Sequence, residues 1–131
     1  SLKSLPETHC SEKPEHPKLK ELKLKTKAIR NEIAKAKGLP LPEATIRILS
    51  SATVAFSEAS ELSGAQKAMR DELGASYALT EASSRSDLLS KGSEYGKNHT
   101  EAEAVANGLI EIIQTLKKVW DYYGMAAQNK I

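Results

Sequence analysis

Apolar side chains recur at alternating steps of three and four residues near the C-terminus, between residues 100 and 123. This spacing places them on one face of an α-helix and leaves the polar side chains on the other. The members of this face are Ala102, Val105, Leu109, Ile112, Leu116, Val119 and Tyr123. Thr100 followed by Glu103 has the form of a capping box, which predicts that the helix begins at Thr100. A face this wide needs partner helices to cover it.

A second apolar seam runs through the middle of the chain, between residues 42 and 92. Its members are Ile48, Ala52, Ala55, Ala59, Leu62, Gln66, Met69 and Leu73. The strongest candidate for a break is Ser63-Gly64, because Ser63 and Gln66 can form a capping box, although the seam crosses this point without a change of phase. A polar interval at residues 83–86 is a candidate bend. Residues 93–99, which include Gly96, predict a connection to the C-terminal helix.

A shorter and narrower stripe predicts a first helix over residues 17–37. The stripe consists of Leu19, Leu22, Thr26, Ile29, Ile33 and Ala36. Gly38 is a natural residue to end this helix, and Pro40 and Pro42 disfavour a helical conformation in the residues before them. The sequence therefore predicts a turn between the first helix and the middle segment.

Together these patterns predict an all-α fold, an antiparallel helical bundle built by residues 17–131 as a single domain. A break near Ser63-Gly64 gives four helices of similar length in a compact bundle. Without that break, the fold has three helices, and one long central helix carries the other two in an elongated, coiled-coil-like arrangement. Residues 1–16 are predicted to be a disordered lead-in, because they combine Pro6 and Pro14 with mixed charge and few apolar side chains.

Composition narrows the class of protein. Aromatic residues make up only 5% of the 131 residues, so the core must be built from Ala, Leu, Ile and Val. The single cysteine, Cys10, cannot form a disulfide within the chain, which fits a reducing compartment and predicts a cytoplasmic location. No apolar run reaches the roughly 18 residues of a membrane-spanning helix.

Positive charge is concentrated in the first helix. It contains eight basic residues and two acidic residues, Glu21 and Glu32, so its net charge is +6, whereas the net charge of the whole chain is +2. The basic residues are Lys18, Lys20, Lys23, Lys25, Lys27, Arg30, Lys35 and Lys37. They can dock on the acidic remainder of the bundle, or lie on an anionic membrane. A nucleic-acid partner is not favoured, because no aromatic residues are interleaved for base stacking.

Candidate chemistry is sparse. His9, Cys10 and His16 are metal-ligating residue types, but a polar tail offers no scaffold to hold three or four ligands in fixed geometry. The histidines are expected to lie outside the regular helical core. The sequence contains no nucleophile elbow and no Glu-x-x-His pair of the di-iron type. We therefore expect no catalytic residues, no cofactor, no metal and no enzyme activity.

The remaining features predict a non-catalytic interaction module, a helical bundle used as a scaffold or adaptor that docks on another protein or on a second copy of itself. The partner-binding residues are predicted to be Trp120, Tyr122 and Tyr123, because aromatic side chains dominate the energetics of interfaces. The alternative for Trp120 and Tyr123 is that they complete the core. The alternative is a peripheral membrane adaptor that places the basic helix, residues 17–37, on anionic lipid.

Overall fold

The computed structural model of the protein describes residues 14–129, so most of the predicted lead-in lies outside the described residues. This part of the chain is entirely helical apart from its connections, and contains no β-strand. The all-α prediction is confirmed. The elements are α2 (Pro17–Lys35), α3 (Pro42–Tyr77), the short 3₁₀ helix η1 (Ala82–Ser84) and α4 (Arg85–Asn129).

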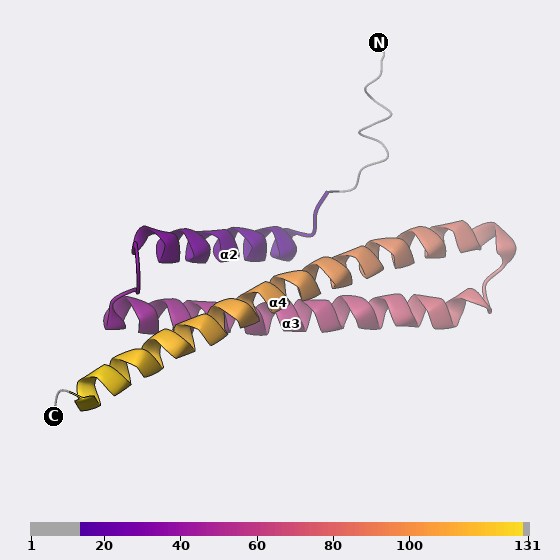
Figure 1. The fold of residues 1–131 in the computed structure, drawn as a ribbon. Coiled ribbons are helices and arrows are strands. Elements are labelled where there is room, and N and C mark those ends of the chain that lie inside the picture. Colours follow the sequence, from indigo (N-terminus) through magenta and orange to yellow (C-terminus); the bar gives the residue numbers. More distant parts are fainter. Residues whose placement is uncertain (1–13, 130–131) are drawn as a thin grey trace, which may run out of the picture.

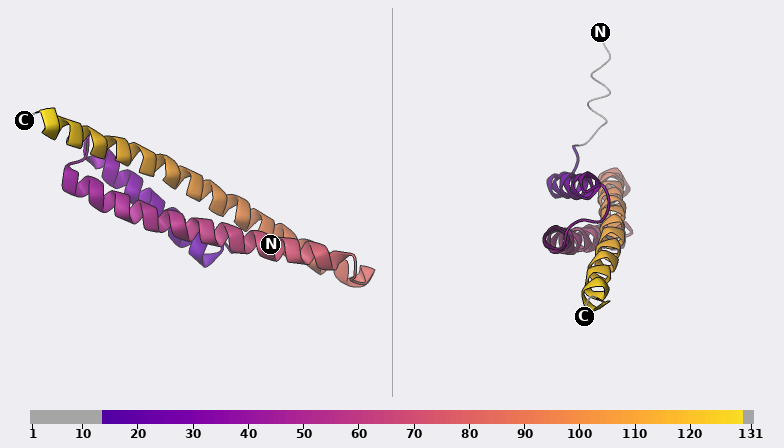
Figure 2. Two further views of the ribbon diagram at one scale, coloured as in Figure 1. Left: turned by 90° about the horizontal axis from the view of Figure 1, so that it is seen from below. Right: turned by 60° about the vertical axis from the view of Figure 1, so that its left-hand side comes forward.

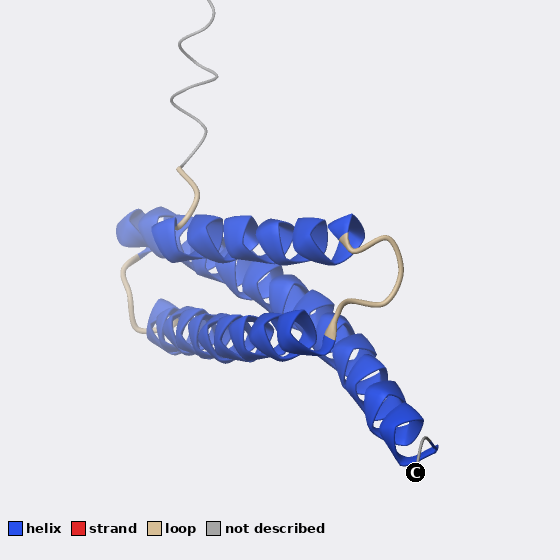
Figure 3. Ribbon diagram, turned by 90° about the vertical axis from the view of Figure 1, so that its left-hand side faces the viewer, coloured by secondary structure: helices blue, strands red, loops and turns tan. Residues whose placement is uncertain are grey.

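The two long helices, α3 and α4, run antiparallel and form an extended hairpin (Figure 1). α2 runs antiparallel to α3 and covers only the half of the hairpin that lies near the α2–α3 connection (Figures 1 and 2). The C-terminal end of α4 diverges from both other helices and extends past them (Figure 3). One half of the molecule is therefore a three-helix bundle, and the other half is a two-helix hairpin.

The core lies where the three apolar stripes meet, and most of the predicted stripe residues are buried there. α2 contributes Leu19, Leu22 and Ile29, and α4 contributes a longer series that includes Leu109 and Leu116. The side of the core formed by α3 is dominated by small residues: its buried members are Ile48, Ala52, Ala55, Ala59 and Leu62. Because alanine side chains are short, they allow the backbones of neighbouring helices to approach closely.

The predicted break at Ser63-Gly64 is wrong, because α3 continues through these residues to Tyr77. Ser63 is buried against α4, where its hydroxyl group lies 2.8 Å from Nδ1 of His99. The hydroxyl that could have capped a new helix is therefore engaged by the neighbouring helix. The four-helix arrangement is not confirmed: residues 14–129 form three α-helices.

Gly64 provides a test of this continuity. A Cβ atom built on Gly64 meets no neighbouring atom within 4 Å, and the residue lies inside α3. We expect Gly64→Ala to raise the free energy of unfolding by about 1 kcal/mol, because alanine favours the helical conformation over glycine by that amount. Urea denaturation followed by circular dichroism measures it.

Gly38→Ala is the matched control, because Gly38 has φ +140° and an alanine there is strained. The control should lose stability where Gly64→Ala gains it. A loss of stability in Gly64→Ala would contradict a helix that is continuous across residues 63–64.

The chain turns back at residues 78–84, in and just before the polar interval predicted to bend. Arg85, the first residue of α4, closes this turn: its Nε donates a hydrogen bond to the Thr80 carbonyl oxygen at 3.0 Å, and its guanidinium lies 5.1 Å from the centre of the Tyr77 ring. The elongated arrangement requires one central helix that extends to residue 92. The turn at residues 78–84 interrupts that helix.

The predicted connection at residues 93–99 and the predicted helix start at Thr100 are also wrong, because α4 runs unbroken from Arg85 to Asn129. This stretch is packed against α3. Asn98 is buried there, and a Cβ atom on Gly96 would lie 3.4 Å from Cδ of Arg70. Gly96 therefore lies inside α4 at an ordinary packing distance from Arg70 of α3, and it does not end a helix.

The end of α2 differs from the prediction in detail. The helix ends at Lys35, and Lys37 adopts a left-handed conformation with φ 50°. Gly38 follows with φ 140°, so the reversal of the chain uses both residues and not Gly38 alone.

Candidate functional site

The three aromatic residues predicted to bind a partner lie in the last turns of α4 but in different environments. Trp120 and Tyr122 are 42% and 55% exposed. Tyr123 is half-buried, and its hydroxyl group donates a hydrogen bond to the Pro40 carbonyl oxygen at 2.7 Å. Tyr123 therefore fastens α4 to the α2–α3 connection, while Trp120 and Tyr122 stay accessible.

Further exposed apolar side chains come from the same end of the molecule. They belong to the α2–α3 connection, the first turns of α3 and the last turns of α4: Leu39, Leu41, Ile46 and Met125. We call Trp120, Tyr122 and these four residues the apolar end. Isolated exposed apolar residues are normal, but a group of them at one end of a helix bundle is typical of an interaction surface.

The eight basic residues predicted on the first helix divide into two groups. Three of them form ion pairs, which tie α2 to the rest of the bundle: Lys18 and Lys25 each contact Glu58 of α3 at 3.3 Å, and Lys23 contacts Glu101 of α4 at 2.7 Å. Among residues 14–129, the other five form no ion pair: Lys20, Lys27, Arg30, Lys35 and Lys37.

The ion pairs shift the acid–base equilibria of their members in opposite directions. Hydrogen bonds from Lys18 and Lys25 lower the pKa of Glu58 below its ordinary value, and similar bonds lower the pKa of Glu21. The pKa of Lys23 is raised, first by its hydrogen bond to Glu101 and then by that to Glu15. These pairs are exposed to solvent, so they orient α2 more than they stabilise it.

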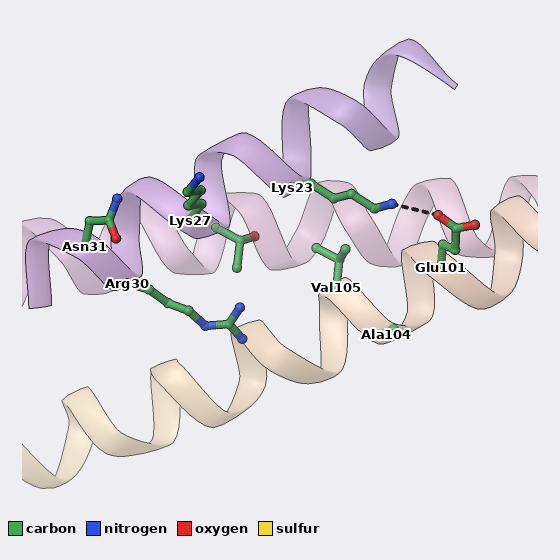
Figure 4. Close-up of a pocket in the computed structure, with 8 residues that line it drawn as sticks. Lys23, Lys27, Arg30, Asn31, Glu101, Ala104 and Val105 are labelled. Atoms are coloured by element: carbon green, nitrogen blue, oxygen red, sulfur yellow. Dashed lines mark hydrogen bonds and ion pairs between the residues drawn. The ribbon is translucent and has the colours of Figure 1, made fainter. Parts of the chain in front are cut away.

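Two open grooves flank α2. The groove between α2 and α4 has a volume of about 620 Å³, and the groove between α2 and α3 has a volume of about 500 Å³. The first, which we call the basic groove, is lined by Lys23, Thr26, Lys27, Arg30, Asn31, Glu101, Ala104 and Val105 (Figure 4). A smaller hollow of about 270 Å³ shares Arg30 with the basic groove and adds Ile33, Gly108, Glu111, Ile112 and Thr115.

A polar cluster between α3 and α4 was not predicted. Asn98 donates a hydrogen bond from Nδ2 to Oε1 of Gln66 at 3.0 Å, and Nδ1 of His99 lies 3.1 Å from the Ser63 carbonyl oxygen. The prediction that the histidines lie outside the helical core is wrong for His99, which is half-buried in α4. The spacing of residues could have indicated that Asn98 is buried. Asn98 precedes Ala102 by four residues, so it extends the apolar seam of α4 toward the N-terminus.

His16 also has a structural place. It is the N-cap residue of α2, and its Nδ1 accepts a hydrogen bond from the backbone N–H of Lys18 at 3.1 Å. His9 and Cys10 lie outside the described residues. Within residues 14–129, no group of three or more His, Cys, Asp or Glu side chains comes together in a way that could hold a metal ion.

No helix within residues 14–129 has an apolar stretch that is long enough to span a lipid bilayer. Comparison of the chain with protein-family models, curated proteins and solved structures found no significant match.

Proposed function

We propose that the protein is a non-catalytic protein–protein interaction module that binds its partner through the apolar end. The observation that carries this proposal is the exposure of Trp120 and Tyr122 in the last turns of α4, beside the α2–α3 connection to which Tyr123 is hydrogen-bonded. Trp and Tyr contribute more binding free energy than other residues when a partner buries them. Neither side chain is needed to fill the core, which leaves both available for a partner.

The apolar end is held in place before a partner, another protein or a second copy of the chain, binds to it. Tyr123 anchors the last turns of α4 to Pro40, and its ring packs edge-on against Tyr122 at a centroid distance of 5.9 Å. The exposed aromatic side chains are thus presented from an anchored helix, so less conformational entropy is lost on binding.

The ion pairs of α2 favour this proposal over the membrane-adaptor alternative. Lys18, Lys23 and Lys25 are engaged by carboxylates of the same chain, as expected for a basic helix that docks on its own bundle. Fewer cationic groups are then left to contact anionic lipid, and each contributes only about 1 kcal/mol to such binding.

Site-specific photocrosslinking tests the proposal. The residue p-benzoylphenylalanine replaces Tyr122 in one variant and Leu79 in a control variant, since Leu79 is 91% exposed in the turn at the opposite end of the hairpin. Irradiation is carried out on the pure chain and in an extract of cells that express it. We expect a discrete adduct from position 122, either with a second copy or with another protein, and none of the same mass from position 79.

Trp120→Ala then separates binding from folding. We expect the variant to lose the adduct formed at position 122 while its thermal unfolding curve is little changed. The proposal fails if position 122 gives no specific adduct, or if Trp120→Ala unfolds the chain, which would make Trp120 a core residue.

A further inference from the structure

The two flanks of α2 have different charge balance. On the flank facing α3, the charged side chains that line the groove are neutralised within the chain: Lys25 contacts Glu58 at 3.3 Å, and Glu32 pairs with Arg47. On the flank facing α4, the basic groove carries three cationic side chains and one carboxylate. That carboxylate, Glu101, is already paired with Lys23. An anionic ligand is therefore favoured in the basic groove and not in its counterpart.

Arg30 and Lys27 are the cations left without a carboxylate. Neither forms an ion pair with any residue in the described part of the chain. Arg30 reaches from α2 across to α4 (Figure 4), where its Nη2 atom would lie 2.7 Å from a Cβ on Gly108. The absence of a side chain at Gly108 leaves space for the guanidinium of the exposed Arg30 beside α4, where it can bind a carboxylate with two parallel hydrogen bonds.

Apolar and small groups line much of the groove and its continuation, beside Thr26, Thr115 and the carboxylate of Glu111. Val105 and Ile33 are half-buried there, Ile112 is buried, and Ala104 and Gly108 leave room beside them. Lys23, Lys27 and Arg30 follow one another at steps of four and three along α2, over about 10 Å at about 1.5 Å per residue. A row of cations above an apolar floor between two helices is complementary to a helix that carries carboxylates beside an apolar stripe.

From these features we propose that the basic groove is a binding site for an acidic amphipathic peptide segment of another protein, with Arg30 and Lys27 contacting its carboxylates. The site is separate from the apolar end and does not depend on the proposed function. A single-stranded nucleic acid fits it less well, because none of the described residues that line the groove is aromatic and bases have nothing to stack on.

Peptide selection tests this site with synthetic ligands in place of the natural partner. A phage-displayed library of randomised 16-residue peptides is selected against the immobilised full chain. The strongest binder is then synthesised with a fluorescent label and titrated by anisotropy. We expect the selected peptides to be enriched in Asp and Glu next to apolar residues, and their binding to weaken as the salt concentration rises.

Charge reversal at matched positions locates the binding. Lys27→Glu should weaken binding about tenfold or more, because it places a like charge against the carboxylates of the peptide. The control is Lys35→Glu, which makes the same change on an exposed residue of α2 that lies on a different face of the helix and lines neither groove. The control should change the affinity less than about twofold.

Arg30→Lys tests the guanidinium with the charge unchanged. An ammonium group cannot offer a carboxylate two parallel hydrogen bonds in a fixed fork, so peptide binding should weaken. Replacement of Tyr122 by Ser should leave peptide binding intact, because Tyr122 belongs to the apolar end. This variant therefore distinguishes peptide binding in the basic groove from binding at the apolar end.

Three results would overturn the proposal: selected peptides without acidic enrichment, equal effects of Lys27→Glu and Lys35→Glu, or full binding by Arg30→Lys. The proposal is also overturned if the selection yields no acidic peptides while the chain binds phosphatidylserine vesicles and Lys27→Glu abolishes that binding. That combination would assign the same cations to a lipid surface.

Discussion

Replacement of Leu22 by Ala is expected to lower the free energy of unfolding by about 2–5 kcal/mol. Leu22 is 0% exposed and lies in the core that α2 shares with α3 and α4. The substitution removes three carbon atoms from a site where helices on both sides limit relaxation, so the loss of burial adds to the cost of a cavity. A large part of the free energy that holds α2 on the hairpin resides at such positions.

Leu24→Ala is the matched control for this substitution. Leu24 lies two residues further along α2 and is 60% exposed, so the same chemical change should alter stability by less than about 0.5 kcal/mol. Urea denaturation followed by circular dichroism measures both variants. Equal effects of the two substitutions would mean that α2 does not pack in the observed orientation.

Replacement of Asn98 by Leu is expected to lower the free energy of unfolding by about 1–3 kcal/mol, although leucine is apolar and favours helix. Asn98 is buried, and its amide donates the 3.0 Å hydrogen bond to Oε1 of Gln66. Removal of the donor leaves the Gln66 carbonyl oxygen between two helices without its partner, which costs more than the original hydrogen bond contributes.

The double variant with Gln66→Met and Asn98→Leu distinguishes this explanation from simple crowding. It replaces both polar side chains by apolar ones of similar size, so its stability should return to near that of the original protein. Asn107→Leu, an exposed position of the same helix, is the control for the change of residue type. Additive losses in the double variant would show that the two amides are not coupled.

The apolar seams determined the helical class of this protein and the face that each helix buries. Leu19, Leu22, Ile48, Leu62, Leu109 and Leu116 are all buried, as their spacing predicts. This inference works because a period near 3.6 residues places such side chains on one side of a helix, and water drives that side inward wherever the partner lies.

The positions where the helices begin and end could not be predicted from the apolar seams. Ser63-Gly64, Gly96 and Thr100 carry the local signs of helix ends, yet each lies inside a long helix. The two long helices contact each other at these points: Ser63 meets His99, Asn98 meets Gln66, and Gly96 lies against Arg70. A local preference of about 1 kcal/mol is smaller than the combined contribution of such contacts, so tertiary packing overrides it.

For the candidate sites too, the sequence determined some features and the tertiary structure determined others. The sequence by itself identified the basic helix and the aromatic residues of the C-terminal helix, because charge and residue type are visible without a fold. Only the tertiary structure separated Tyr123, which anchors α4 to Pro40, from the exposed Trp120 and Tyr122. It also distinguished Lys18 and Lys25, which pair with Glu58, from Lys27 and Arg30, which form no ion pair among residues 14–129. The physical reason is that a residue's pairing depends on groups far away in the sequence, such as Glu58 and Gly108, which come within reach only when the three helices have packed.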